Sequence, residues 1–192
     1  MLRVYRRLLG RPLAVIHFDA HCDTWSDHFG EPSGHGTWVW EAFQEGLVEP
    51  SCFTQIGIRS PGEAAAVRYV ANEGGQIFTG RDLRGLESPA QLSPVLAAIR
   101  SRLAAAGHPP LYLSLDIDCL DPAFAPGTGT PEPGGLSSNQ VLSILEELGD
   151  LPFVGMDCVE VSPPYDHADL TSQAAAVFVW TWLCGQCRQT VG

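Results

Sequence analysis

The stretch that decides the fold is Val15-Ile-His-Phe-Asp-Ala-His-Cys-Asp23. It begins as an apolar run of strand length and ends in three potential metal ligands, Asp19, His21 and Asp23, at every second position. Residues i and i+2 of an extended chain point to the same side. We therefore expect these three side chains to form one cluster at the end of a buried strand.

A second stretch repeats this layout, because the apolar residues 111–115 are followed by Asp116 and Asp118. If the two strands are parallel neighbours, both clusters lie at the carboxyl end of the sheet, where open α/β sheets bind their ligands. Aspartates are also common in turns and caps at strand ends. One cluster alone would favour that interpretation, but two clusters at matching strand ends, one with a histidine, favour a metal site.

The chemistry of the five side chains indicates which metal they would bind. Four carboxylates in one place repel one another strongly unless cations lie among them. A set rich in carboxylate, with one imidazole and no thiolate, suits Mn²⁺ better than Zn²⁺. So many ligands would suit two ions that share carboxylates.

Strand-like and helix-like segments alternate along the chain, which predicts a single α/β domain over residues 1–192 with a mainly parallel sheet covered on both faces. Three segments begin with a capping-box pattern, at residues 60–63, 88–91 and 137–140. Strands are expected at 13–18, 52–58, 76–79, 111–115 and 153–161. Helices are expected at 1–9, 37–46, 61–72, 89–106, 138–148 and 170–183.

Composition excludes several classes of function. The formal net charge of −11 argues against a nucleic-acid partner and permits a cationic one. No window has the length of a membrane span, and no signal peptide is evident.

Six cysteines without a disulfide-like spacing suggest a reducing compartment, so a cytoplasmic protein is expected. Cys184 and Cys187 form a single CxxC, which is weak evidence for zinc.

Four motifs together resemble the ureohydrolase (arginase/agmatinase) family: residues 18–23, 114–122, 127–131 and 155–160. The sequence Gly-Thr-Gly-Thr-Pro-Glu at 127–132 is more similar to the agmatinase and guanidinobutyrase branch than to arginase proper. The resemblance implies a three-layer α-β-α fold of arginase/deacetylase type. It also implies that this chain corresponds to the C-terminal two-thirds of that fold and is N-terminally truncated.

The resemblance implies a role for each matching residue. Asp19 and Asp116 match carboxylates that bridge two manganese ions, and His21 and Asp118 match ligands of one ion. Asp23 matches a ligand of the other ion. Two further residues match family residues that are not metal ligands. His35 matches a histidine implicated in proton transfer or substrate positioning, and Glu160 matches the carboxylate that holds the guanidinium group.

The family also has a Gly-Gly-Asp-His motif whose histidine is a sixth ligand, and this chain does not contain it. One ion keeps Asp19, His21, Asp116 and Asp118, whereas the other keeps Asp19, Asp23 and Asp116 without an imidazole. We expect the second ion to bind weakly. The remaining four histidines are interpreted as structural or surface residues: His17, His28, His108 and His167. Asp166 and Asp169 either line the mouth of the site or cap the last helix.

The leading hypothesis is a manganese-dependent amidinohydrolase that releases urea from a small cationic guanidino compound of the agmatine or guanidinobutyrate type. The second hypothesis is a non-catalytic ureohydrolase-like subunit that binds metal without turnover. The third is a related metallohydrolase that acts on another amide. Family resemblance also suggests a homo-oligomer.

Overall fold

The computed structural model describes residues 1–27 and 29–190, and its centre is a five-stranded sheet in which every pair of neighbours is parallel. The strand order is β3-β2-β1-β4-β5, so the two strands that carry the aspartate clusters, β1 and β4, lie side by side in the middle. The strands are β1 (Leu13–Phe18), β2 (Val48–Ile58), β3 (Gln76–Thr79), β4 (Leu111–Asp116) and β5 (Phe153–Val159).

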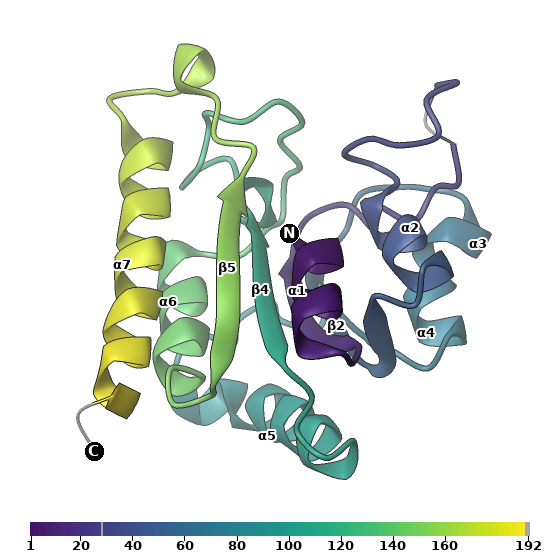
Figure 1. Ribbon diagram of the computed structural model, residues 1–192. Coiled ribbons are helices and arrows are strands. Elements are labelled where there is room, and N and C mark those ends of the chain that lie inside the picture. The colour runs from purple at the N-terminus through teal and green to yellow at the C-terminus, as the bar shows by residue number, and fades with distance from the viewer. Residues whose placement is uncertain (28, 191–192) are drawn as a thin grey trace.

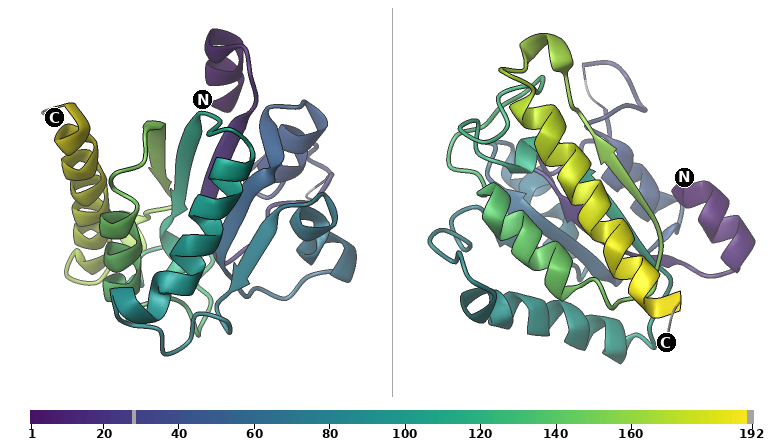
Figure 2. Two further views of the ribbon diagram at one scale, coloured as in Figure 1. Left: turned by 90° about the horizontal axis from the view of Figure 1, so that it is seen from below. Right: turned by 90° about the vertical axis from the view of Figure 1, so that its left-hand side faces the viewer.

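Helices cover both faces of this sheet, which confirms the three-layer prediction. The helices on one face are α1 (Leu2–Leu9), α2 (Trp38–Gln44), α3 (Ala64–Val67) and α4 (Tyr69–Asn72). On the other face are α5 (Pro89–Ala105), α6 (Ser138–Glu147) and α7 (Leu170–Thr190) (Figure 1). The right-hand view of Figure 2 looks onto the layer of α5, α6 and α7, with α1 on the opposite side. Among the described residues no helix is both long and apolar enough to cross a membrane.

The core is divided in two by the alternation of side chains along β1. Ala14, Ile16 and Phe18 belong to the hydrophobic cluster formed with α5, α6 and α7. Leu13 and Val15 belong to the cluster formed with α1, α2 and α4. A strand that is buried on both faces needs apolar residues at successive positions. This explains why β1 is an apolar run interrupted only by His17.

One of the three expected capping boxes is wrong. Capping boxes are present at Ser88 and Ser137, but α3 begins only at Ala64 and has no side-chain cap. The hydroxyl group of Ser60 donates a hydrogen bond of 2.9 Å to Glu132 instead. Ser60 therefore connects to the loop after β4, and the expected helix is replaced by two short ones.

The structure also decides between the two interpretations of Asp166. Its carboxylate accepts hydrogen bonds of 3.0 Å from the backbone N–H groups of Thr171 and Ser172, at the start of α7. Some burial opposes ionisation, but these bonds hold the pKa of Asp166 below its usual range. Asp166 is therefore a cap of the last helix.

The remaining histidines and the cysteines are also placed. His108 and His167 are exposed, as expected, and His28 lies outside the described residues. None of the six cysteines, all within the described residues, forms a disulfide bond, and Cys184 and Cys187 lie on α7. The cytoplasmic location stays a prediction.

Candidate metal centre

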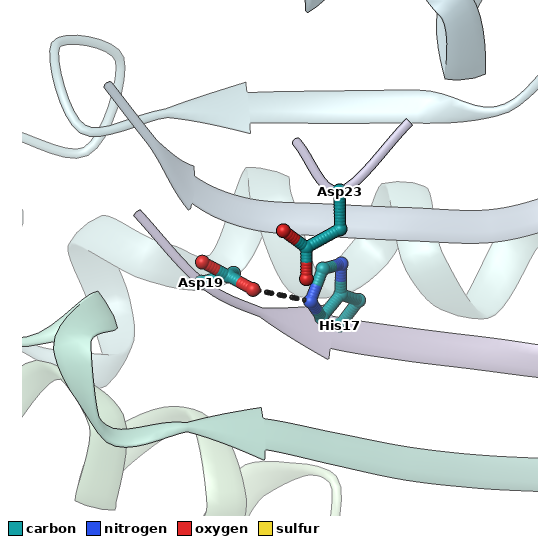
Figure 3. Close-up of side chains that lie close together, drawn as sticks. All are labelled: His17, Asp19 and Asp23. Atoms are coloured by element: carbon teal, nitrogen blue, oxygen red, sulfur yellow. Dashed lines mark hydrogen bonds and ion pairs between the residues drawn. The ribbon is translucent and has the colours of Figure 1, made fainter. Parts of the chain in front are cut away.

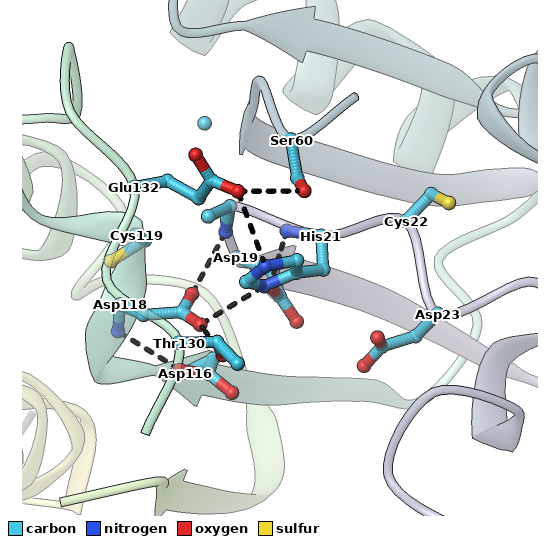
Figure 4. Close-up of polar contacts among 12 residues, drawn as sticks. Asp19, His21, Cys22, Asp23, Ser60, Asp116, Asp118, Cys119, Thr130 and Glu132 are labelled. Atoms are coloured by element: carbon cyan, nitrogen blue, oxygen red, sulfur yellow. Dashed lines mark hydrogen bonds and ion pairs between the residues drawn. The ribbon is translucent and has the colours of Figure 1, made fainter. Parts of the chain in front are cut away.

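The two aspartate clusters meet at one end of the sheet. Phe18 of β1 pairs in register with Leu115 of β4, so the next residues, Asp19 and Asp116, leave neighbouring strands side by side. Both line the same cavity. Figure 4 shows their carboxylates among those of Asp118 and the ring of His21. The expected convergence of the two strand ends is thus present in the structure.

A first group of potential ligands is made by Asp19, His21 and Asp118, whose ligand atoms lie within 4.8 Å of one another. Nδ1 of His21 is 3.0 Å from Oδ2 of Asp118 and 3.3 Å from Oδ1 of Asp19. The backbone holds both carboxylates, because His21 N–H donates to Asp19 over 2.6 Å and Ala20 N–H donates to Asp118 over 3.0 Å. The loop after β1 therefore orients the ligands of both strands.

A second group consists of His17, Asp19 and Asp23, again within 4.8 Å (Figure 3). His17 is buried and its Nε2 atom is 2.8 Å from Oδ2 of Asp19. The interpretation of His17 as a structural residue is compatible with this burial, and the expected lack of a histidine ligand for the second ion stays a prediction. The proximity of the His17 ring to Asp19 and Asp23 was not predicted from the sequence. The sequence contains a signal for this proximity, because His17, Asp19 and His21 stand at every second position.

The electrostatics of the cluster show how crowded its negative charges are. Burial, followed by the charges of Asp19 and Asp118, raises the pKa of Asp116 to about 10. Burial and the charge of Asp19 likewise raise the pKa of Asp23 well above its usual value. Burial also opposes ionisation of Asp19, but His17 and the bonds from His21 outweigh it and lower its pKa. Without cations the cluster therefore keeps some of its protons.

His21 has the opposite behaviour. Burial by itself would lower its pKa, but hydrogen bonds with Asp118 and Asp19 raise it to about 11. A protonated His21 thus neutralises part of the negative charge in the metal-free cluster. A divalent cation among the same oxygens would replace that proton.

The neighbouring thiols do not join the ligand set. Cys119 is fully buried, and burial raises the pKa of its thiol well above the ordinary value, which keeps it protonated. In Figure 4 the sulfur atoms of Cys22 and Cys119 point away from the carboxylates. The donors that converge are carboxylate oxygens and imidazole nitrogen, a set that fits hard or borderline divalent ions.

A cavity of about 500 Å³ lies beside the cluster and contains the remaining predicted residues. Its lining includes His35 from the loop before α2 and Glu160 from the end of β5, and both are exposed. Glu160 has a backbone φ of 63° and its carboxylate faces Gly129. His21 and Asp118 are not among the residues that line the cavity. His35 and Glu160 therefore share the cavity with Asp19, Asp23 and Asp116.

Comparison with known proteins adds to this geometry. The sequence model of the Arginase family matches residues 1–185. This chain belongs to the arginase family. Membership in the arginase family, together with two ligand groups that share Asp19, indicates a binuclear metal site.

Curated relatives of this arginase-family chain include agmatinases. The agmatinase of Chromobacterium violaceum is 42% identical over 186 residues, which cover 96% of this chain and 53% of the relative. The agmatinase of Proteus mirabilis is 40% identical over 179 residues, which cover 92% of this chain and 52% of the relative. The chain thus spans about half the length of the curated relatives it matches.

Solved structures show the same fold. The proclavaminate amidino hydrolase of Streptomyces clavuligerus has a TM-score of 0.86 and 40% identity, and the match covers 98% of this chain and 59% of that one. A hypothetical agmatinase from Burkholderia thailandensis has a TM-score of 0.84 and 39% identity, and the match covers 100% of this chain and 56% of that one. These likenesses confirm the arginase-type fold expected from the motifs.

Proposed function

We propose that this chain forms the metal-binding part of a manganese-dependent amidinohydrolase. The reaction is hydrolysis of a linear guanidino compound, of the agmatine or guanidinobutyrate type, to urea and an amine. The observation that carries the proposal is the cluster of possible ligands around Asp19, with His21 and Asp118 in one group and Asp23 in the other, beside an acidic cavity. The names of the relatives, agmatinase and proclavaminate amidino hydrolase, support the same reaction class.

The metal ligands in this proposal are Asp19, His21, Asp23, Asp116 and Asp118. Bound manganese would supply Lewis acidity and lower the pKa of a water molecule, which makes a strong nucleophile available near neutral pH. The carboxylates neutralise the cations and fix where they lie. The loop N–H groups of Ala20 and His21 hold those carboxylates before any ion arrives.

Glu160 binds the guanidinium group in this proposal. A carboxylate pairs with a planar guanidinium through two parallel hydrogen bonds, which fixes both position and orientation. Glu160 lines the same cavity as Asp19 and Asp116, so a guanidinium paired with it would lie in the cavity beside the ligand cluster. A guanidinium carbon is a poor electrophile, so the reaction needs the group to be held close to a strong nucleophile.

His35 transfers a proton to the leaving amine. It lies in the loop before α2, which lines the same cavity as Asp116 and Glu160. An imidazole can both take and give a proton within one turnover, which suits this role. Because most charged side chains around the cavity are acidic, a cationic substrate is favoured over an anionic one.

A urea-release assay with added Mn²⁺ tests the proposal on the 192-residue chain. Agmatine and guanidinobutyrate serve as substrates, and the Glu160→Gln variant removes the guanidinium partner while keeping the side-chain shape. The matched control is Glu73→Gln, at an exposed position outside the cavity. We expect urea release that Glu160→Gln abolishes and Glu73→Gln leaves unchanged. Manganese binding without urea release would instead favour the non-catalytic alternative.

A further inference from the structure

A row of polar side chains crosses the sheet beside the ligand cluster, two residues before Asp19 on β1 and two residues before Asp116 on β4. His17 of β1 pairs in register with Gln55 of β2 and with Ser114 of β4, and Ser114 pairs with Asp157 of β5. The row lies on the face of the sheet that α1 and α2 cover. The next residues on that face, two positions earlier along the strands, include Val15 and are apolar. Polar groups in such a buried position need partners.

His17 links this row to the metal centre. Its ring is 1% exposed, and Nε2 lies 2.8 Å from Oδ2 of Asp19. Oδ1 of the same carboxylate accepts a hydrogen bond of 2.6 Å from the backbone N–H of His21. Oδ2 is hydrogen-bonded to His17, whereas Oδ1 also lies 3.3 Å from Nδ1 of His21. Since a carboxylate offers about two acceptor positions per oxygen, the bond to His17 leaves a second position on Oδ2 for a cation. A cation that His21 also binds would take the place of the contact between Nδ1 of His21 and Oδ1.

Gln55 determines which nitrogen of His17 carries the proton. The amide Nε2 of Gln55 donates to the carbonyl oxygen of Cys22 over 2.9 Å and lies 3.2 Å from Nδ1 of His17. The reverse orientation of this amide would place two carbonyl oxygens against each other. Because Gln55 presents an N–H to His17, Nδ1 is the acceptor and Nε2 carries the hydrogen that is donated to Asp19.

We propose that His17 is a positioning residue that fixes the orientation of the Asp19 carboxylate, and that Gln55 keeps His17 in the tautomer that can do so. This inference rests on the proposed function, in which Asp19 is the carboxylate that two ions would share. His17 acts through Asp19 and is not itself a ligand, although one of its ring nitrogens lies within 4.8 Å of a carboxylate oxygen of Asp23. Partners behind metal ligands of this kind commonly affect metal affinity 10- to 100-fold.

Two variants of His17 separate positioning from packing. His17→Gln keeps an N–H donor near the place of Nε2, whereas His17→Leu keeps the volume without a donor. Free Mn²⁺ is measured by electron paramagnetic resonance during titration of each chain. We expect His17→Leu to bind Mn²⁺ about 10- to 100-fold more weakly and His17→Gln to recover most of that loss. His167→Leu, at an exposed position outside the cavity, is the control and should bind as the wild type does.

Equal Mn²⁺ affinity of the wild type and His17→Leu would overturn the positioning role. Thermal unfolding of each metal-free variant shows whether it is folded. If His17→Leu does not fold, the comparison passes to Gln55→Leu, which removes the partner that fixes the tautomer and should also weaken Mn²⁺ binding. Unchanged binding by a folded Gln55→Leu variant would overturn the role assigned to Gln55.

A nitrogen NMR spectrum of protein labelled with ¹⁵N in the histidine rings decides the tautomer of His17, and this measurement does not depend on turnover. In the metal-free chain we expect Nε2 of His17 to be protonated and Nδ1 to be an acceptor, with no change when Zn²⁺, a diamagnetic probe, is added. Loss of the Nε2 proton on Zn²⁺ addition would make His17 a ligand and overturn the proposal. A wild-type chain that binds no Mn²⁺ overturns the proposed function instead, and the metal-free spectrum still decides the tautomer.

Discussion

The indole N–H of Trp38 donates a hydrogen bond of 2.8 Å to Oδ2 of Asp23. The backbone carbonyl of Asp23 in turn accepts from the N–H of Val39 over 3.1 Å, and Asp23 has a left-handed φ of 52°. The first turn of α2 therefore holds both the backbone and the side chain of this aspartate. The position of Asp23 depends on packing of α2 against the sheet as well as on the end of β1.

Replacing Trp38 by phenylalanine should weaken one metal site without unfolding the protein. The change keeps an aromatic ring against His17 and removes the donor to Asp23. We expect the weaker of two Mn²⁺ binding events to lose about 10- to 100-fold in affinity. Calorimetric titration measures both events. The control is Trp180→Phe, at a position on α7 that is 68% exposed, and equal titrations for both variants would refute the role of Trp38.

Metal binding should release protons. In the metal-free chain the pKa of Asp116 is about 10 and that of His21 is about 11, so both groups are protonated at neutral pH. A bound cation requires their deprotonated forms, so apparent Mn²⁺ affinity should rise as the pH rises from 6 to 8. Calorimetry in buffers with different ionisation enthalpies counts the released protons. A heat of binding that does not depend on the buffer would contradict these pKa values.

Arg59 should contribute strongly to stability through the loops around the site. Its guanidinium donates to the backbone carbonyls of Asp118, Leu120 and Glu132, among others, and so connects the loop after β2 to the loop after β4. Lysine cannot reproduce this fork of donors. We expect Arg59→Lys to lower the free energy of unfolding by about 2–3 kcal/mol.

Urea denaturation of Arg59→Lys measures that loss directly. Arg81→Lys is the control, because Arg81 is exposed and lies in the turn after β3. A free energy of unfolding that is the same for the two variants would show that the carbonyl contacts of Arg59 add little to stability.

Much of the fold could be predicted because apolar segments of strand length alternate with helix-like segments along the chain. Residues 13–18 are apolar except for His17, which is typical of a strand buried on both faces, and the structure places β1 in the middle of the sheet. The aspartates that follow β1 and β4 then had to share one end of a parallel sheet. Strand alternation thus predicted the convergence of Asp19 and Asp116.

Contacts made over long sequence distances could not be predicted in this way. Ser60 had a local capping pattern, but its hydroxyl bonds to Glu132, which is remote in sequence. The spacing of two places His17 on the same side of the strand as Asp19, but nothing local shows that Gln55 faces the other ring nitrogen of His17. Such partners depend on the register between strands, which the sequence pattern alone does not specify.

Anomalous X-ray diffraction from crystals of this chain soaked in MnCl₂ tests the central claim most directly. We predict a strong manganese peak in contact with Asp19, His21 and Asp118, and a weaker peak between Asp19 and Asp23. Peaks confined to other parts of the surface, or no peak in contact with Asp19, would contradict the metal centre and the amidinohydrolase function that depends on it.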